Sequence, residues 1–275
     1  MLALVCLCLM ANSSFSQNRK RVTSKTVTIP FGVGGTFSII GAPNGSILIE
    51  GTSRSEIEIT ATIQTEALSD ADLDAVGVFT TFALEEGSGR LAVFTVGSHN
   101  KLGDKRIWKK IPKNLLSLPF KIDYVVRVPY YCDLSVNGGI GSLKILNIEG
   151  AIRASMVNSD ANVALRGGSL ALTVGTGNIE LSFPERNWRS GTIDTELSNG
   201  NMKVSLPFNL GADIDAVVAN TGAVNSDIID LKPRQADAPF TEREIIGKLG
   251  SGGVAVKFLV GSGNIKLLRH TKPTP

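Results

Sequence analysis

The chain has 275 residues, of which 43% are hydrophobic, 19% are charged and 29 are glycine. This composition can fill a sizeable core and is typical of many short strands joined by tight turns; it does not fit a disordered chain or a helical bundle. The net charge of +3 is too small to indicate a nucleic-acid partner.

The N-terminus predicts a signal peptide over residues 1–16. Leu2 to Ala11 is an unbroken apolar run, too short to span a bilayer but of the length of a signal-peptide core. Ser14 and Ser16 are small residues that suit cleavage before Gln17. We therefore expect an extracytoplasmic protein, periplasmic, secreted or at the cell surface. The alternative is an N-terminal strand packed in the core, since no Lys or Arg precedes the run.

Two of the three cysteines, Cys6 and Cys8, lie inside this run and would be removed with it. Neither follows the small residues that a lipoprotein cleavage site needs, so no lipid anchor is predicted. Cys132 would then be the remaining cysteine, which excludes an intrachain disulfide. It lies in phase with Leu134 and Val136, a pattern that favours a small buried side chain over a nucleophile.

Residues 17–25 are polar and basic and predict a flexible leader. An N-terminal β portion is expected over residues 26–121, with alternating strands such as Ser55 to Ile63. Within it, residues 68–76 predict a helix that Ser69 caps, and residues 79–96 predict a hairpin. No second long apolar segment follows, so no transmembrane segment is predicted.

From residue 122 to 268 the chain becomes repetitive, and residues 269–275 form a tail. Strands that alternate apolar and polar residues enter short polar turns, most of them with glycine, and a new strand follows about every 20 residues. One gap spans about two periods and contains the charged stretch Leu231 to Lys248. The turns begin at Val136, Val157, Val174, Leu197, Ala219 and Val260. This pattern predicts an all-β fold: a β-solenoid or β-helix-like stack of short strands after a less regular N-terminal β portion.

Three of these units are Gly-Thr-Gly-Asn-Ile-Glu-Leu, Ser-Asn-Gly-Asn-Met-Lys-Val and Gly-Ser-Gly-Asn-Ile-Lys-Leu. Together with Tyr124 to Val136 they resemble the DUF4097 family of bacterial β-strand repeat proteins, labelled as candidate adhesins. The resemblance covers roughly residues 120–268 in the sense of period matching. It implies a solenoid-like fold and an extracytoplasmic location. The sequence departs from it at Asn158-Ser-Asp, where the turn glycine is missing, and in the stretch 231–248.

Residues with catalytic or metal-binding chemistry are few. His99 and His270 lie in no metal-ligand spacing, and no nucleophile elbow or P-loop lysine is found. The glycine turns faintly resemble calcium-binding repeats, but the positions that would need acids are Asn178, Asn201, Ala223 and Asn264. We therefore expect no cofactor, no metal and no catalytic residue, and interpret these turns as structural.

The strongest candidate for a partner site is the basic segment Lys101 to Lys113, with six basic residues and one acidic residue. Basic side chains around an aromatic ring could hold an anionic lipid or glycan. The alternative is a solvated loop whose tryptophan covers one end of the stack. The candidate residues are Lys101, Lys105, Arg106, Trp108, Lys109, Lys110 and Lys113.

The leading hypothesis is an exported, non-catalytic binding or adhesin-like module whose partner is an envelope glycan, lipid or surface protein. The alternative is a carbohydrate-active enzyme on a β-helix scaffold, which would need converging carboxylates. A third hypothesis is end-to-end self-association through unpaired edge strands. The outward acids that could form a catalytic floor are Glu180, Asp194, Glu196, Asp213 and Asp215.

Overall fold

The computed structural model describes residues 18–100, 105–184, 191–235 and 237–269. The predicted signal peptide and tail therefore lie outside the described residues, apart from Arg269. Within these ranges the fold is all-β, with nineteen strands and three short helices. None of the helices is long and apolar enough to cross a membrane.

Most elements are short strands, and the helices lie in the N-terminal half of the chain, between residues 70 and 116. The helices are α1 (Asp70–Phe79), α2 (Lys105–Lys110) and α3 (Lys113–Leu116). The first strands are β1 (Arg19–Pro30), β2 (Thr36–Asn44), β3 (Ile47–Thr52), β4 (Glu56–Ala67), β5 (Thr81–Gly87), β6 (Arg90–Val96), β7 (Phe120–Pro129) and β8 (Asp133–Ile140). The remaining strands are β9 (Leu143–Asn158), β10 (Ala161–Thr176), β11 (Ile179–Ser182), β12 (Thr192–Asn199), β13 (Met202–Leu206), β14 (Ala212–Thr221), β15 (Val224–Ser226), β16 (Lys232–Pro233), β17 (Glu244–Leu249), β18 (Val254–Ser262) and β19 (Ile265–Arg269).

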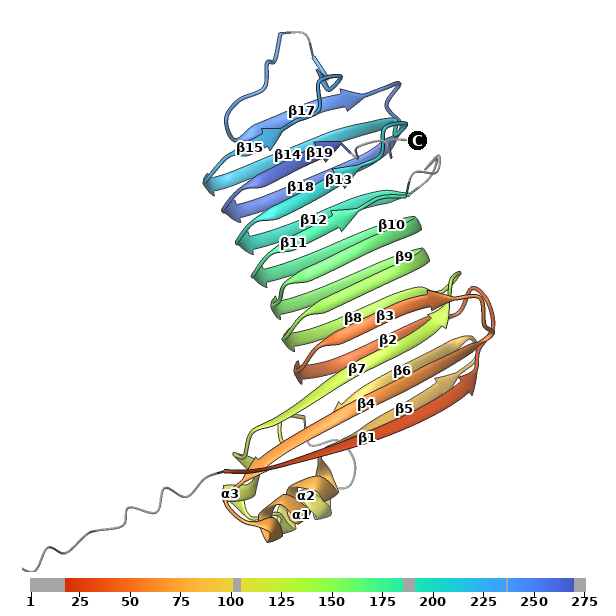
Figure 1. Cartoon of the computed structure of the whole chain (residues 1–275), viewed down its shortest axis with the longest axis vertical. Coiled ribbons are helices and arrows are strands. Elements are labelled where there is room, and N and C mark those ends of the chain that lie inside the picture. Colours follow the sequence, from red (N-terminus) through yellow and green to blue (C-terminus); the bar gives the residue numbers. More distant parts are fainter. Residues whose placement is uncertain (1–17, 101–104, 185–190, 236, 270–275) are drawn as a thin grey trace, which may run out of the picture.

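The strands form two layers that run side by side along the long axis of the molecule (Figure 1). The first layer contains, in spatial order, β5, β6, β2, β8, the second halves of β9 and β10, β12, β18, β14, β17 and β16. The second layer contains β1, β4, β7, β3, the first halves of β9 and β10, β11, β13, β19 and β15. Most neighbours in the middle of the stack are parallel and in register.

Long strands link the two layers. β9 pairs with β3 over Leu143–Leu146 and with β8 over Ile152–Asn158, so its two halves belong to different layers. Between the halves, Asn147 has a φ of 59°, the left-handed conformation that asparagine tolerates better than most residues. This local bend lets one continuous strand supply apolar side chains to both sides of the core.

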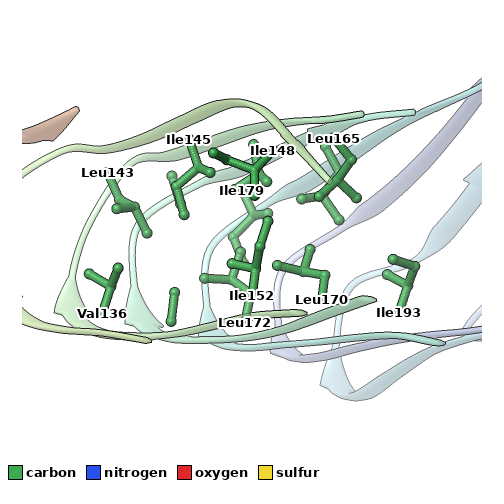
Figure 2. Close-up of a cluster of buried hydrophobic side chains, with 14 of the residues drawn as sticks. Val136, Leu143, Ile145, Ile148, Ile152, Leu165, Leu170, Leu172, Ile179 and Ile193 are labelled. Atoms are coloured by element: carbon green, nitrogen blue, oxygen red, sulfur yellow. The ribbon is translucent and has the colours of Figure 1, made fainter. Parts of the chain in front are cut away.

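One hydrophobic cluster fills the space between the layers and extends from Phe31 to Leu267. Figure 2 shows its centre, where Leu143 and Ile145 from the second layer point toward Val136 and Ile152 from the first. The alternation in the sequence is the cause, because successive side chains of a strand point to opposite faces and only one face is apolar. Residues 26–121 and 122–268 therefore share one core.

The spatial order of the strands differs from the chain order at both ends. β18 and β19 lie between β12–β13 and β14–β15, although they come last in the sequence. Likewise β2 and β3 lie between β6–β7 and β8–β9. The long gap in the repeat is therefore the segment that leads the chain past β14 and back to β18 on its other side. The strand β17 in this segment pairs antiparallel with β14 and covers its edge.

Residues 19–25, expected as part of a flexible leader, instead form the first half of β1. This strand pairs with β4 in an antiparallel register that places Val27 beside Ile59 and Ile29 beside Ile57. The prediction of a flexible leader was wrong, because backbone pairing with the long strand β4 orders this polar segment. The segment's own side chains would not order it. The predicted helix does begin after its cap Ser69, but it continues through Gly77 to Phe79.

The N-terminal end of the stack is closed by side chains. β1 pairs with β4 and β5 pairs with β6, and neither has a second partner among the described strands. Lys25 lies opposite Ala61, on the side of β1 that faces the core, and its Nζ donates a 2.9 Å hydrogen bond to Thr81 Oγ1 of β5. An inward-facing lysine on an edge strand discourages another strand from adding there.

We expect Lys25→Ile to make the protein associate through its N-terminal end, because it removes the charge that guards two unpaired edges. The measurement is molar mass by light scattering over a range of protein concentrations. Lys20→Ile is the matched control, since Lys20 lies on the opposite face of the same strand, beside Glu66. If Lys25→Ile and Lys20→Ile behave alike, Lys25 does not protect this edge.

Candidate functional site

The basic segment does not present its tryptophan to the surface. Trp108 lies on α2, is 8% exposed, and its ring stands edge-on to Phe79 of α1 with centroids 5.5 Å apart. Val76 and Leu115 complete a small core beneath the helices. This arrangement corresponds to the alternative in which the tryptophan covers one end of the stack, because a ring packed in a core cannot contact a ligand.

The lysines of this segment lie elsewhere. Lys109, Lys110 and Lys113 are exposed at the helical end of the molecule. Lys101 and the side chains of Lys105 and Arg106 lie outside the described residues. Of the seven candidate residues, the described side chains are therefore the buried Trp108 and the three exposed lysines, and these lysines do not surround an exposed aromatic ring.

A second candidate site lies where the turns between the two layers stack. The position after each turn carries Asp160, Asn178, Asn201 or Asn264, which we call the turn column. Asp160 Oδ1 accepts from the backbone N–H and the side-chain amide of Asn178, both at 3.0 Å. The same contact recurs upward: Asn178 Oδ1 accepts from the Asn201 backbone at 3.3 Å, and Asn201 Oδ1 from the Asn264 backbone at 3.1 Å. The column ends at the backbone N–H of Ala223, which donates to Asn264 Oδ1 at 3.1 Å.

These hydrogen bonds argue against two functions that the glycine turns could have had, calcium binding and phosphate binding. A calcium site needs oxygen ligands, but these Oδ1 atoms already accept hydrogen bonds from the next turn. A phosphate cradle needs free backbone N–H groups, but those of Asn178, Asn201 and Asn264 are donated to the side chain below. The turn column is therefore a structural ladder that links successive turns.

A cleft of about 650 Å³, which we call the turn-side cleft, opens beside the turn column on the outer face of the second layer. Its second wall is a row of outward side chains that lie side by side in register across β10, β11, β13, β19 and β15. The buried residues Ala161, Ile179 and Met202 contribute to its floor. The row consists of Asn162, Glu180, Lys203, Lys266 and Asn225.

Charges in this row are only partly compensated. Glu180 accepts from Lys203 Nζ at 2.7 Å and from the Asn162 side-chain amide at 3.2 Å. Lys266 lies beside Lys203 in register, yet it has no ion-pair or hydrogen-bond partner within the described parts of the chain. Asn225, next to Lys266, is exposed and likewise has no described partner. The upper half of the cleft thus offers an ammonium group and an amide to a ligand.

The acids proposed for a catalytic floor are divided between the two layers, and most of them have a cationic or backbone partner. Glu180 lies in the second layer, whereas the other four lie in the first. Lys257 lies 3.9 Å from Asp194 and 3.7 Å from Glu196, and Asp215 pairs with Arg234. The fifth, Asp213, accepts a 3.3 Å hydrogen bond from the backbone of Gly253. Asp194 and Glu196 share Lys257 on the outer face of β12, and neither cleft that one of the five acids lines in the described parts of the chain contains a second of them.

Cys132 lies in the core and His99 lies at a turn. Burial raises the pKa of the Cys132 thiol to about 12, which keeps it protonated and unreactive, as a small buried side chain should be. Burial lowers the pKa of His99, whose Nε2–H donates to the Gly41 carbonyl at 2.9 Å and partly opposes that shift. Within the described ranges no three His, Cys, Asp or Glu side chains lie close enough to hold a metal ion.

Sequence reasoning identified the turn positions but missed the turn-side cleft. Asn178, Asn201 and Asn264 were considered only as neutral residues that fail to make a calcium site. The signal that could have revealed the ladder is the recurrence of Asn directly after Gly at the same point of three turns, because stacked asparagines bond one another. The row beside it depends on register between strands far apart in sequence.

No family model matches the chain, and no curated protein matches its sequence. Among solved structures, a candidate cell adhesion protein from Clostridium sporogenes is 14% identical with a TM-score of 0.50, over 91% of this chain and 100% of that one. Candidate adhesins from Bacteroides fragilis and Parabacteroides distasonis are 12% and 13% identical, with TM-scores of 0.29 and 0.32. Each covers 90% of this chain and 97% of its own. Only the first superposes well enough to bear on the architecture, and it is a solved bacterial structure with a similar fold.

Proposed function

We propose that this chain is an exported, non-catalytic surface-binding module of the cell envelope, built as a β-solenoid of the DUF4097 kind. The observation that carries the proposal is the turn-side cleft, which successive strands line with amides and charged groups while the core behind it stays apolar. A rigid stack that repeats polar side chains at strand spacing suits recognition of an extended partner.

Two further observations support this proposal. The apolar run before residue 17 has the length of a signal-peptide core, which would deliver the protein to the periplasm or the cell surface. The solved structure with a similar fold is itself described as a candidate cell adhesion protein. The exposed lysines 109, 110 and 113 at the helical end are a second, weaker surface for an anionic envelope component.

The test is co-sedimentation of the purified protein with bacterial envelope fractions at physiological ionic strength. We expect retention in the envelope pellet and release by soluble envelope glycan, with little change after the lipids are extracted. An unrelated protein of similar size and net charge controls for ionic adhesion. If the protein stays in the supernatant with envelopes of both Gram-negative and Gram-positive cells, the proposed function is wrong.

A further inference from the structure

We propose that the turn-side cleft binds an acidic polysaccharide chain, with a sugar carboxylate held between Lys266 and Lys203 and with sugar hydroxyls hydrogen-bonded by Asn225 and Asn162. The inference rests on the proposed function and specifies the ligand class of one site. The charges, the amides and the shape of the cleft each support a part of it.

The charges indicate an anionic group. Lys203 and Lys266 are neighbours in register on adjacent parallel strands, an arrangement of like charges that disfavours the pairing. Glu180 neutralises Lys203, but Lys266 has no partner among the described residues. A carboxylate bound beside Lys266 would supply the missing charge, and charge-assisted hydrogen bonds are the stronger ones that such a ligand can make.

The amides indicate hydroxyl groups along the rest of the ligand. Each sugar hydroxyl both donates and accepts a hydrogen bond, and a carboxamide offers both roles. Asn162 and Asn225 stand at opposite ends of the row, with the turn column along one side. Successive strands in the stack are about 4.8 Å apart, so a ligand that crosses several strands meets a polar group at every step.

The shape of the cleft argues against a lipid surface and against an added peptide strand. The apolar residues that line it, Ala161, Ile179 and Met202, are buried and form its floor, so no exposed apolar side chain could enter a bilayer. The strands β11, β13 and β19 already have a hydrogen-bonded neighbour on each side, so a peptide cannot extend them. The short strand β15 at the end of the row pairs with β19, and the Val224 N–H on its other side already donates to the Glu242 carbonyl at 2.8 Å. The ligand that still fits the cleft is a polar chain that lies across the strands.

The test is calorimetric titration of the purified protein with a short oligogalacturonate, and with the methyl ester of the same oligomer as the neutral probe. We expect the acid to bind and the ester to bind about tenfold more weakly or not at all, because one charge-assisted contact is lost. Lys266→Gln should weaken the acid about tenfold and leave the weaker ester unaffected. Asn225→Ala should weaken both probes by a smaller factor.

The matched control is Lys257→Gln, because Lys257 is an exposed lysine at the same end of the stack but on the outer face of the first layer. We expect it to bind the acid as the unchanged protein does, and all three variants to keep the melting temperature. Equal affinity for acid and ester, or an unaffected Lys266→Gln, would overturn the inference. If envelopes retain the protein while the oligogalacturonate fails to bind, the ligand class is wrong and the proposed function stands; if both fail, both are wrong.

Discussion

Replacing Gly200 with alanine is expected to destabilise the fold by roughly 3–5 kcal/mol. Gly200 has a φ of 136°, a conformation essentially restricted to glycine. A Cβ at this position would lie 1.7 Å from the backbone oxygen of Gly177 in the turn below. The Cβ is bonded directly to the backbone and the oxygen belongs to it, so neither atom can move without separating the strands that follow.

The measurement is urea unfolding followed by far-ultraviolet circular dichroism, with the midpoint compared at equal slope. Gly77→Ala is the matched control, because Gly77 lies in α1, is exposed, and has open space where the Cβ would be placed. That exchange should stabilise the protein by about 0.5–1 kcal/mol, since alanine is the better helix former. An unchanged midpoint for Gly200→Ala would show that the turns do not stack as tightly as described.

Gly200 also shows how far the sequence alone could lead. Glycine at the turn and alternation in the flanking strands predict where each strand ends and which side faces the core. Leu170, Leu172 and Val174 are all buried, as their spacing indicates, and so is Cys132. These are local properties, because a side chain's face depends only on its position along its own strand.

The order of the strands could not be predicted in the same way. The repeats are alike, so the sequence does not state which repeat pairs with which. β13 pairs with β19 rather than with β15, its next counterpart along the chain. The position of the turn-side cleft follows from these pairings, since a shift of one residue in register would turn Lys203 or Lys266 toward the core.

The edge strand β1 was missed for a related reason. Eight of its twelve side chains are polar, and its ordering comes from pairing with β4 and from contacts to α1. Arg19 pairs with Asp70 and Arg21 pairs with Asp74, so charges that suggested a solvated leader are bound to the helix. Composition predicts disorder well only where no neighbouring element supplies the partner.

Trp108→Ala is expected to cost roughly 3–5 kcal/mol and to loosen the helical end, the range found when a large buried aromatic side chain is removed. The ring is almost fully buried and packs edge-on against Phe79 at a centroid distance of 5.5 Å. Trp108 is the largest of the four buried side chains in this small cluster, with Val76, Phe79 and Leu115, so its removal leaves a large part of the cluster empty. In Trp108→Ala, amide hydrogen exchange should accelerate more in α1 than in the strands at the centre of the stack, each compared with the unchanged protein.

Neutralising Lys109, Lys110 and Lys113 together is the matched control, because these lysines belong to the same segment but are exposed. This triple variant should keep the unfolding midpoint within about 0.5 kcal/mol, as exposed substitutions usually do. Trp108→Phe should recover most of the stability lost in Trp108→Ala, since a smaller ring still packs against Phe79. The opposite pattern, in which Trp108→Ala folds normally but no longer sediments with envelopes, would mean that the tryptophan contacts the ligand. Because Trp108 packs beneath α1, we expect Trp108→Ala to lose stability and the lysine variant to keep it. Removing the ring exposes the end of the core rather than a binding surface.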